Sequence, residues 1–292
     1  MVKMNVKCIP CIIAVRVREL NMLPLDDRKI FYILNHIIKY LAHYTTPEIN
    51  MTRLATQAFR ILKKLSGFSD PYVKEKSLAN KTALIIAEEM NNYINSLKGY
   101  EKTIFLLKLA TLGNALDFGI AGYHYNIKQI TSEISTMNIA LNNIPKLMEL
   151  IIKSRKIAYL LDNAGEAIFD KLLIEELASL GKDVVVIVKS GSFQNDITFK
   201  EARELGFHEK ARLLETKSDA SSIFIDEISR ETLDEILSAD LIIAKGMAHY
   251  EYLSTEKFLK KPVAYLLKAK CEVIANDLNV PIGSYVIKIE VP

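Results

Sequence analysis

The sequence has few of the features that mark secreted, membrane-spanning or nucleic-acid-binding proteins. Its 292 residues include only three cysteines, Cys8, Cys11 and Cys271, too few for the disulfide framework of a small secreted protein. Basic and acidic residues nearly balance, at 38 against 35, so charge gives no reason to expect a nucleic-acid partner. Apolar runs end well before the roughly 20 residues that a membrane span requires. We therefore predict a cytoplasmic protein with no nucleic-acid partner and no membrane partner.

Several common nucleotide and phosphate motifs are also missing. No GxGxxG follows a predicted strand, and no GxxxxGK[ST] occurs anywhere. The turn after the first predicted strand is Asp-Asn-Ala-Gly-Glu, which lacks the glycine-rich pattern of an S-adenosylmethionine methyltransferase. Ala164 stands where the haloacid dehalogenase type of phosphatase needs a second aspartate. These absences exclude the most familiar versions of an α/β enzyme.

The residues that are present predict two different halves. Residues 1 to about 155 carry amphipathic helical patterns, with helices expected at about 31–44, 46–67, 71–97 and 101–115, and a last one opened by Pro145. After residue 155, short apolar runs alternate with helical segments. The runs cover residues 157–161, 184–188, 212–215, 241–244, 263–267 and 285–289. This alternation predicts an α/β domain over residues 156–292 with a doubly wound, mostly parallel sheet, whose last strand is an antiparallel edge.

Polar side chains follow the predicted strands at their carboxyl ends. Asp162 and Asn163 end the first run, Lys189 and Ser192 follow the second, with Asp196 shortly after, and Lys245 ends the fourth. In open parallel sheets these ends meet in one crevice where ligands bind. Two carboxylates and an amide are hard oxygen ligands that suit Mg²⁺ or Mn²⁺. Lys189, Lys245 and the Ser192 turn could then receive a phosphate.

Simpler roles remain open for each of these residues. Asp162 and Asp196 stand where ordinary helix caps are common. The pair Cys8-Ile-Pro-Cys11 could be redox-active, half of a metal site, or two small apolar residues at a helix start. We favour the structural role for these cysteines, because no second CxxC completes a zinc site. His249 and Glu251 are expected to be ordinary residues at the start of a helix.

A set of ordered motifs resembles one known family. The motifs are CIPC, LGNALDFG, YLLDNAGEAIFDKLLIEEL, VKSGSFQNDIT, IIAKGMAHYE and LLKAKCEVIA, in chain order. Together they span essentially the whole chain and resemble the damage-control phosphatase family, long filed as domain of unknown function 89, in its CxxC-containing branch. The resemblance implies a helical part packed on a Rossmann-like α/β part, and a metal-dependent phosphatase acting on small phosphate esters. It also implies that Asp162, Asn163 and Asp196 hold the metal, and that Asn114, Asp117 and Lys245 line the phosphate site.

The sequence thus predicts a phosphatase that hydrolyses small phosphomonoesters, such as sugar phosphates or damaged metabolites, with one divalent ion: Mn²⁺, Mg²⁺, Co²⁺ or Ni²⁺. Asp162 and Lys245 are the predicted catalytic residues, and Asp162 serves either as nucleophile or as metal ligand only. Two alternatives stay open: a non-catalytic protein that binds a phosphorylated metabolite, and a carboxyl methyltransferase. The paired aspartates favour the enzyme, because a phosphate sensor would more naturally surround its anion with cations and amides.

Overall fold

A seven-stranded sheet forms the centre of the molecule. The computed structural model describes residues 2, 4–114, 127–256 and 258–292, with 127–129 described by their backbone alone. The strand order is β1-β7-β6-β5-β2-β3-β4, and every neighbouring pair is parallel except β6 with β7. The strands are β1 (Ile139–Asn142), β2 (Lys156–Leu160), β3 (Asp183–Val188), β4 (Arg212–Glu215), β5 (Leu241–Lys245), β6 (Val263–Lys268) and β7 (Tyr285–Glu290). The predicted α/β fold with a mostly parallel, doubly wound sheet is confirmed.

Two expectations about the sheet are wrong. Strand β1 lies in the half predicted to be helical, and it pairs with β7, so β7 is antiparallel to β6 but does not form the edge of the sheet. Strand β1 is only four residues long, too short for alternating polarity to distinguish it from a loop. Its place in the sheet depends on pairing with a strand more than 140 positions away, at Tyr285.

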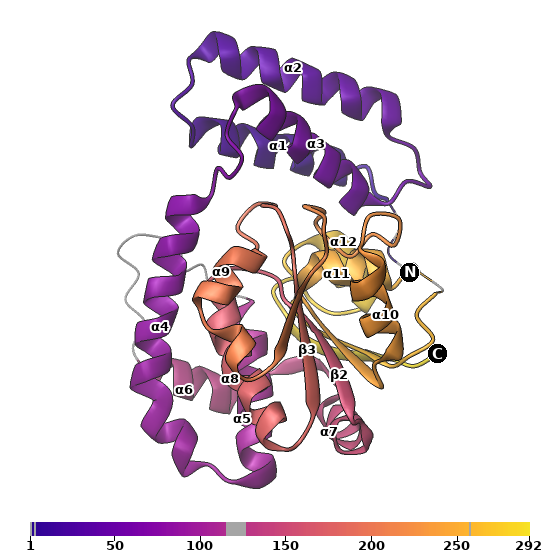
Figure 1. The fold of residues 1–292 in the computed structure, drawn as a ribbon. Helices are drawn as coiled ribbons and strands as arrows, with labels where there is room; N and C mark the ends of the chain where they lie inside the picture. The colour runs from indigo at the N-terminus through magenta and orange to yellow at the C-terminus, as the bar shows by residue number, and fades with distance from the viewer. Residues whose placement is uncertain (1, 3, 115–126, 257) are drawn as a thin grey trace.

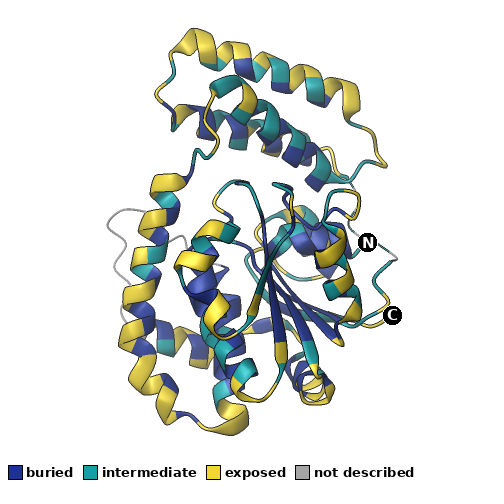
Figure 2. Ribbon diagram, in the orientation of Figure 1, coloured by how far each residue is buried: buried dark blue, intermediate teal, exposed yellow. Residues whose placement is uncertain are grey.

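Helices cover both faces of the sheet (Figures 1 and 2). Val184, Val186 and Val188 of β3 pack into one face's core, and Val185 and Ile187 into the other. A strand buried on both faces reads as an unbroken apolar run. On the first face lie α4 (Val73–Ser96), α5 (Gly99–Gly113), α6 (Ile127–Thr136), α7 (Ile144–Lys153), α8 (Glu166–Ser179) and α9 (Phe199–Glu204). On the second lie α10 (Arg230–Ser238), α11 (Gly246–Leu253) and α12 (Glu272–Leu278).

The first three helices form a separate layer over the carboxyl ends of the strands, at the top of Figure 1. They are α1 (Cys8–Asn21), α2 (Asp27–Tyr44) and α3 (Met51–Ser66), and they bury a small core of their own. Helix α3 begins after Asn50, whose side chain accepts a hydrogen bond from the Thr52 amide, and not at Thr46 and Pro47 as expected. The Asn50 cap explains this start, because it satisfies an amide that the helix leaves unpaired.

The expected boundary at residue 155 does not separate two cores. Helices α4 to α7 precede that residue, yet their apolar side chains belong to the same cluster as those of the sheet. The helical part therefore consists of a three-helix roof and a group of helices that belongs to the α/β layer. In the described part of the chain, no helix is both long enough and apolar enough to span a bilayer.

Candidate active site

The candidate site lies where the chain changes direction across the sheet. From β2 the chain builds outward through β3 and β4, then returns to add β5 on the other side of β2. Ligands bind at such a switch point in open α/β sheets, because the loops on either side diverge and leave a crevice. Asp162 stands two residues beyond β2, and Lys245 is the last residue of β5. The switch point thus holds two of the predicted residues.

The loop after β3 folds back and brings Asp196 to this crevice. Asn163 and Asp196 form an isolated antiparallel bridge, and the Ile197 amide donates to the carbonyl of Asp162 at 2.9 Å. Asp162 and Asp196 are both buried, with 7% and 4% of each residue exposed. Backbone pairing therefore fixes these two carboxylates beside each other at the carboxyl edge of the sheet, as predicted.

Amide side chains hold one oxygen of Asp162. Nδ2 of Asn114 and Nδ2 of Asn163 donate to its Oδ2 at 3.1 and 2.8 Å. Both amides also donate to the Glu166 carboxylate, at 2.8–3.1 Å. The other end of Asn114 accepts a hydrogen bond from the Lys268 amide at 3.1 Å. Asn114 thus ties the end of α5 to the site, and its predicted contact with a phosphate stays a prediction.

Lys245 is fully buried and has three partners. Its Nζ donates to Glu166 Oε1 at 2.6 Å and to the carbonyl oxygen of Ala110 at 2.6 Å, and lies 2.9 Å from Asp170 Oδ1. An ammonium group has three protons, so these contacts use all of them. Direct contact between Lys245 and a phosphate stays a prediction, while the observed geometry makes this lysine the counter-ion of Glu166 and Asp170.

The residues after β3 are also engaged within the protein. Lys189 forms a buried ion pair with Asp196, and the Ser192 hydroxyl donates to the backbone carbonyl of Ser69 at the start of the α4 segment. Of this group, Lys189 is the cation that lies directly beside the two aspartates. Asp117, the remaining predicted residue, lies outside the described residues.

Carboxyl groups at the site outnumber the ammonium groups that pair with them. Four carboxylates, Asp162, Glu166, Asp170 and Asp196, share two ammonium groups, Lys189 and Lys245. Burial, followed by the charges of Asp196 and Glu166, raises the pKa of Asp162 to about 8. Burial also raises the pKa of Asp196, although Lys189 opposes the shift. Burial acts against the Glu166 carboxylate too, yet Lys245 lowers the pKa of that group below its usual value. Lys189, helped by the charge of Lys270 at Asp162 and of Lys76 at Asp196, therefore leaves these two aspartates incompletely compensated.

The chain matches the damage-control phosphatase ARMT1-like domain over residues 4–286. It belongs to this family. An uncharacterized protein of Methanocaldococcus jannaschii is 36% identical, with 98% of this chain and 95% of the relative covered. A damage-control phosphatase of Archaeoglobus fulgidus is 31% identical, with 98% and 99% covered. The crystal structure of a DUF89 family protein of Pyrococcus horikoshii superposes with a TM-score of 0.89 at 25% identity, over 98% of this chain and 99% of that one.

The donor set of this ARMT1-like domain fits one divalent ion only with help from amide oxygens or water. No group of three or more histidine, cysteine, aspartate or glutamate side chains in the described ranges could hold an ion alone. Asp162 and Asp196 supply two hard carboxylates, and the Asn163 amide is an additional oxygen ligand if it rotates. Mg²⁺ is commonly bound in this manner, through one or two carboxylates with several retained waters. The residues therefore fit such an ion.

Several members of the site were not predicted from the sequence. Glu166 and Asp170 are four residues apart on a helix with apolar residues on nearly every side, which was the available signal of a buried charged pair. His249 is buried, and burial lowers the pKa of its imidazole to about 3. Its ring nitrogens contact the Ser222 hydroxyl at 3.0 Å and the Leu161 carbonyl at 3.2 Å, so it braces the end of β2 as a neutral side chain.

Proposed function

We propose that this protein hydrolyses a small phosphomonoester with the help of one divalent ion, Mn²⁺, Mg²⁺, Co²⁺ or Ni²⁺, held by Asp162, Asn163 and Asp196. The observation that carries the proposal is the convergence of two buried, incompletely compensated aspartates at the switch point of the sheet. A divalent cation would offset the charge that the lysines leave. A phosphate would then bind beside both the cation and the Lys189 ammonium group.

The surrounding residues would orient the reacting groups. Asn114 fixes one oxygen of Asp162, and Lys245 fixes Glu166, which in turn accepts from the Asn163 amide. Lys189 would move from Asp196 to the phosphoryl oxygens when an ion occupies the aspartates, and would there offset developing negative charge. When bound, the metal ion supplies Lewis-acid polarisation of the phosphoryl group. We assign Lys245 to the positioning of carboxylates in this scheme.

The names of the relatives support hydrolysis of a phosphate ester. The Archaeoglobus fulgidus protein is named a damage-control phosphatase, and so is a Pyrococcus horikoshii protein that is 27% identical over 97% of each chain. Both matches run over nearly the full length of this chain. The reaction class is therefore proposed from the family together with the aspartate pair.

Metal removal and replacement test the proposal. Protein treated with a chelator should lose hydrolysis of an aryl phosphate and of small sugar phosphates, and Mn²⁺, Mg²⁺, Co²⁺ or Ni²⁺ should restore it. Asp196→Asn should lower kcat/KM by on the order of 10³-fold or more, equivalent to several kcal/mol of transition-state stabilisation. Asp183→Asn, at the opposite end of β3, is the control and should retain activity.

If no metal restores hydrolysis of any phosphomonoester, a non-catalytic metabolite-binding protein becomes the better assignment. If the chelated protein transfers a methyl group to an acceptor, a carboxyl methyltransferase becomes the better assignment.

The role of Asp162 can be decided separately. Direct attack by water inverts the configuration at phosphorus, while a covalent aspartyl-phosphate intermediate requires two displacements and retains it. A substrate with a chiral, isotopically labelled phosphorothioate therefore distinguishes the two routes. We expect inversion, because Oδ2 of Asp162 is held by two amides and its carboxylate is assigned to the metal.

A further inference from the structure

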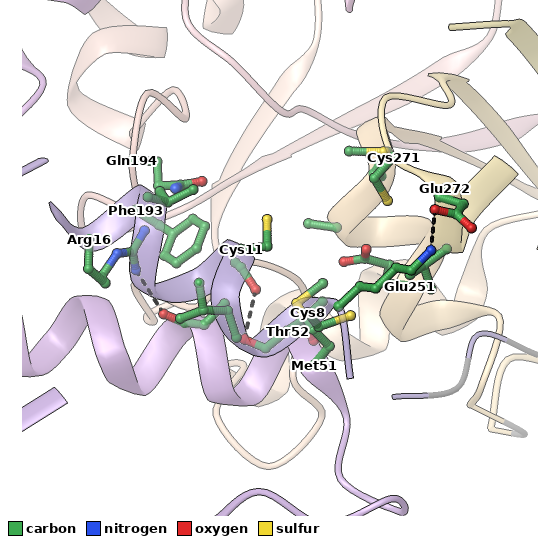
Figure 3. Close-up of a pocket in the computed structure, with 18 residues that line it drawn as sticks. Cys8, Cys11, Arg16, Met51, Thr52, Phe193, Gln194, Glu251, Cys271 and Glu272 are labelled. Carbon is green, nitrogen blue, oxygen red and sulfur yellow. Dashed lines mark hydrogen bonds and ion pairs between the residues drawn. The ribbon is translucent and has the colours of Figure 1, made fainter. Parts of the chain in front are cut away.

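A cavity of about 420 Å³ lies beneath the roof helices, and Figure 3 shows the residues that line it. Its walls come from α1 and α3 of the roof and from the segments that follow β3, β4, β5 and β6. Phe193 and Gln194 in one wall stand three and two positions before Asp196, and Met247 in another follows Gly246, which touches Asp162. The volume lies within the range of about 300–1,000 Å³ of small-molecule sites. The cavity is thus placed to receive whatever is attached to a phosphate bound at the aspartates.

Sulfur and hydrocarbon dominate the lining of this cavity. All three cysteines of the chain reach it, with Met51 and Met247. Thiols and thioethers are weak hydrogen-bonding groups that adapt their packing to apolar and aromatic partners. Ligand hydroxyls buried against such a wall would lose their bonds to water without replacement, which is unfavourable.

The charged side chains in the lining are mostly committed elsewhere. Arg16 pairs with Glu19 and donates to the carbonyl of Ala55, and Lys7 pairs with Glu272. Glu251 differs, because the residue is 7% exposed and its carboxyl group makes no hydrogen bond or ion pair with any other described residue. A buried carboxyl without a protein partner needs water or a ligand to complete its hydrogen bonds. Water or a ligand in the cavity is placed to supply these hydrogen bonds.

We infer that this cavity binds the alcohol part of the phosphomonoester, and that this part is predominantly apolar or aromatic and not a polyhydroxylated sugar. The inference rests on the proposed phosphatase function, and it narrows the substrate class that the sequence left broad. The apolar walls of the cavity would gain from each methylene transferred out of water, whereas a sugar would bring more hydroxyls than the Glu251 carboxyl group can bind.

A series of primary alkyl phosphates tests the inference, because the leaving alcohols are chemically similar. With the metal-loaded enzyme, kcat/KM should rise about fourfold for each methylene from ethyl through butyl to hexyl phosphate. Hexyl and 2-phenylethyl phosphate should both exceed glycerol phosphate. A flat series, or a preference for glycerol phosphate, would overturn the inference while leaving the phosphatase function in place.

Two alanines of the roof provide a matched pair of variants. Ala55 lines the cavity, whereas Ala14 on α1 is exposed to solvent. Ala55→Phe should fill the cavity and reduce the ratio of kcat/KM for hexyl over ethyl phosphate toward one, while Ala14→Phe should keep the ratio of the unmodified protein. Val15→Phe fills the cavity from another wall and serves if Ala55→Phe does not fold, as judged by thermal unfolding. An unchanged ratio in both cavity variants would contradict the inference.

Binding of non-hydrolysable phosphonates separates this inference from the proposed function. Calorimetry should show hexylphosphonate binding more tightly than ethylphosphonate, with the difference lost in Ala55→Phe. If this holds but no ester is hydrolysed, the cavity assignment stands and the phosphatase assignment fails. If affinity does not increase with chain length, the cavity assignment fails whatever the enzyme hydrolyses.

Discussion

Gly246 lies so close to Asp162 that a β-carbon built on it would fall 1.9 Å from Asp162 Oδ2. Its φ of +76° is also in the left-handed region, which side chains other than glycine rarely adopt. Gly246 opens helix α11 directly after Lys245. The backbone of one strand end therefore forms a wall against the carboxylate at the end of the neighbouring strand.

Gly246→Ala should abolish activity and destabilise the fold, because the added methyl group must displace Asp162. Gly67→Ala is the matched control, since Gly67 has a φ of +83° but open space around its missing β-carbon. Both variants carry the strain of a left-handed residue, about 1–2 kcal/mol. Steady-state kinetics and chemical denaturation should show that only Gly246→Ala also loses turnover. Equal turnover in Gly246→Ala and Gly67→Ala would contradict the close contact between Gly246 and Asp162.

Lys245→Met should destabilise the protein by about 3–5 kcal/mol, because Glu166 and Asp170 would remain buried without their cation. The exposed pair Lys146–Glu149 gives the control, and Lys146→Met should change the free energy of unfolding by less than about 1 kcal/mol. Urea denaturation measures both. Adding Asp170→Asn to Lys245→Met should recover part of the loss. A variant with normal stability but a strongly raised KM would instead favour direct phosphate binding by Lys245.

Much of the α/β half could be predicted because its signals are local. Strand β4 occupies the predicted residues, and β2 and β3 each differ from the prediction by about one residue, because an apolar run between helices has few other structures open to it. The convergence of Asp162, Asp196 and Lys245 followed from the rule that parallel strands share a carboxyl edge. Asp162 and Lys245, at strand ends, could therefore be placed at the site without long-range information, whereas Asp196 reaches it because its loop pairs with Asn163.

The features that sequence reasoning missed depend on contacts between distant residues. Strand β1 exists because β7 offers it an unpaired edge, and the commitment of Lys245 to Glu166 and Asp170 depends on how α8 packs on β5. Glu251 resembles an ordinary helix residue in the sequence, and its burial arises from the roof helices above it. Local sequence patterns predict the helices, the strands and the residues at the carboxyl edge of the sheet. Which buried charged groups pair with each other depends on how these elements pack.

Asp162→Asn should raise the thermal unfolding temperature of the metal-free protein at pH 8 and remove its response to metal. The rise is expected because the substitution removes a carboxylate whose ionisation is opposed by burial and by Asp196. An ion that binds only the folded state should stabilise the unmodified protein by about 2.7 kcal/mol at a concentration of 100 Kd. Differential scanning calorimetry with and without Mn²⁺ measures both effects. A full metal response in Asp162→Asn would remove this residue from the ligand set.

Glu251→Gln should stabilise the protein progressively as the pH rises. Burial, with a smaller contribution from Asp162, raises the pKa of the Glu251 carboxyl from 4.5 to about 8. Below pH 4.5 the group is protonated in both the folded and unfolded chain and has no linked effect. Between these values the folded chain holds the proton more tightly than the unfolded chain, so the free energy of unfolding falls as the pH rises and levels off above pH 8. The amide does not titrate, and the advantage of Glu251→Gln should therefore grow over this window to on the order of a few kcal/mol.

Urea denaturation of metal-free protein from pH 4.5 to 8.5 measures the difference, with Glu149→Gln on the exposed surface of α7 as the control. If the difference in the free energy of unfolding between Glu251→Gln and the unmodified protein does not change with pH, the Glu251 carboxyl group is solvated by water in the cavity.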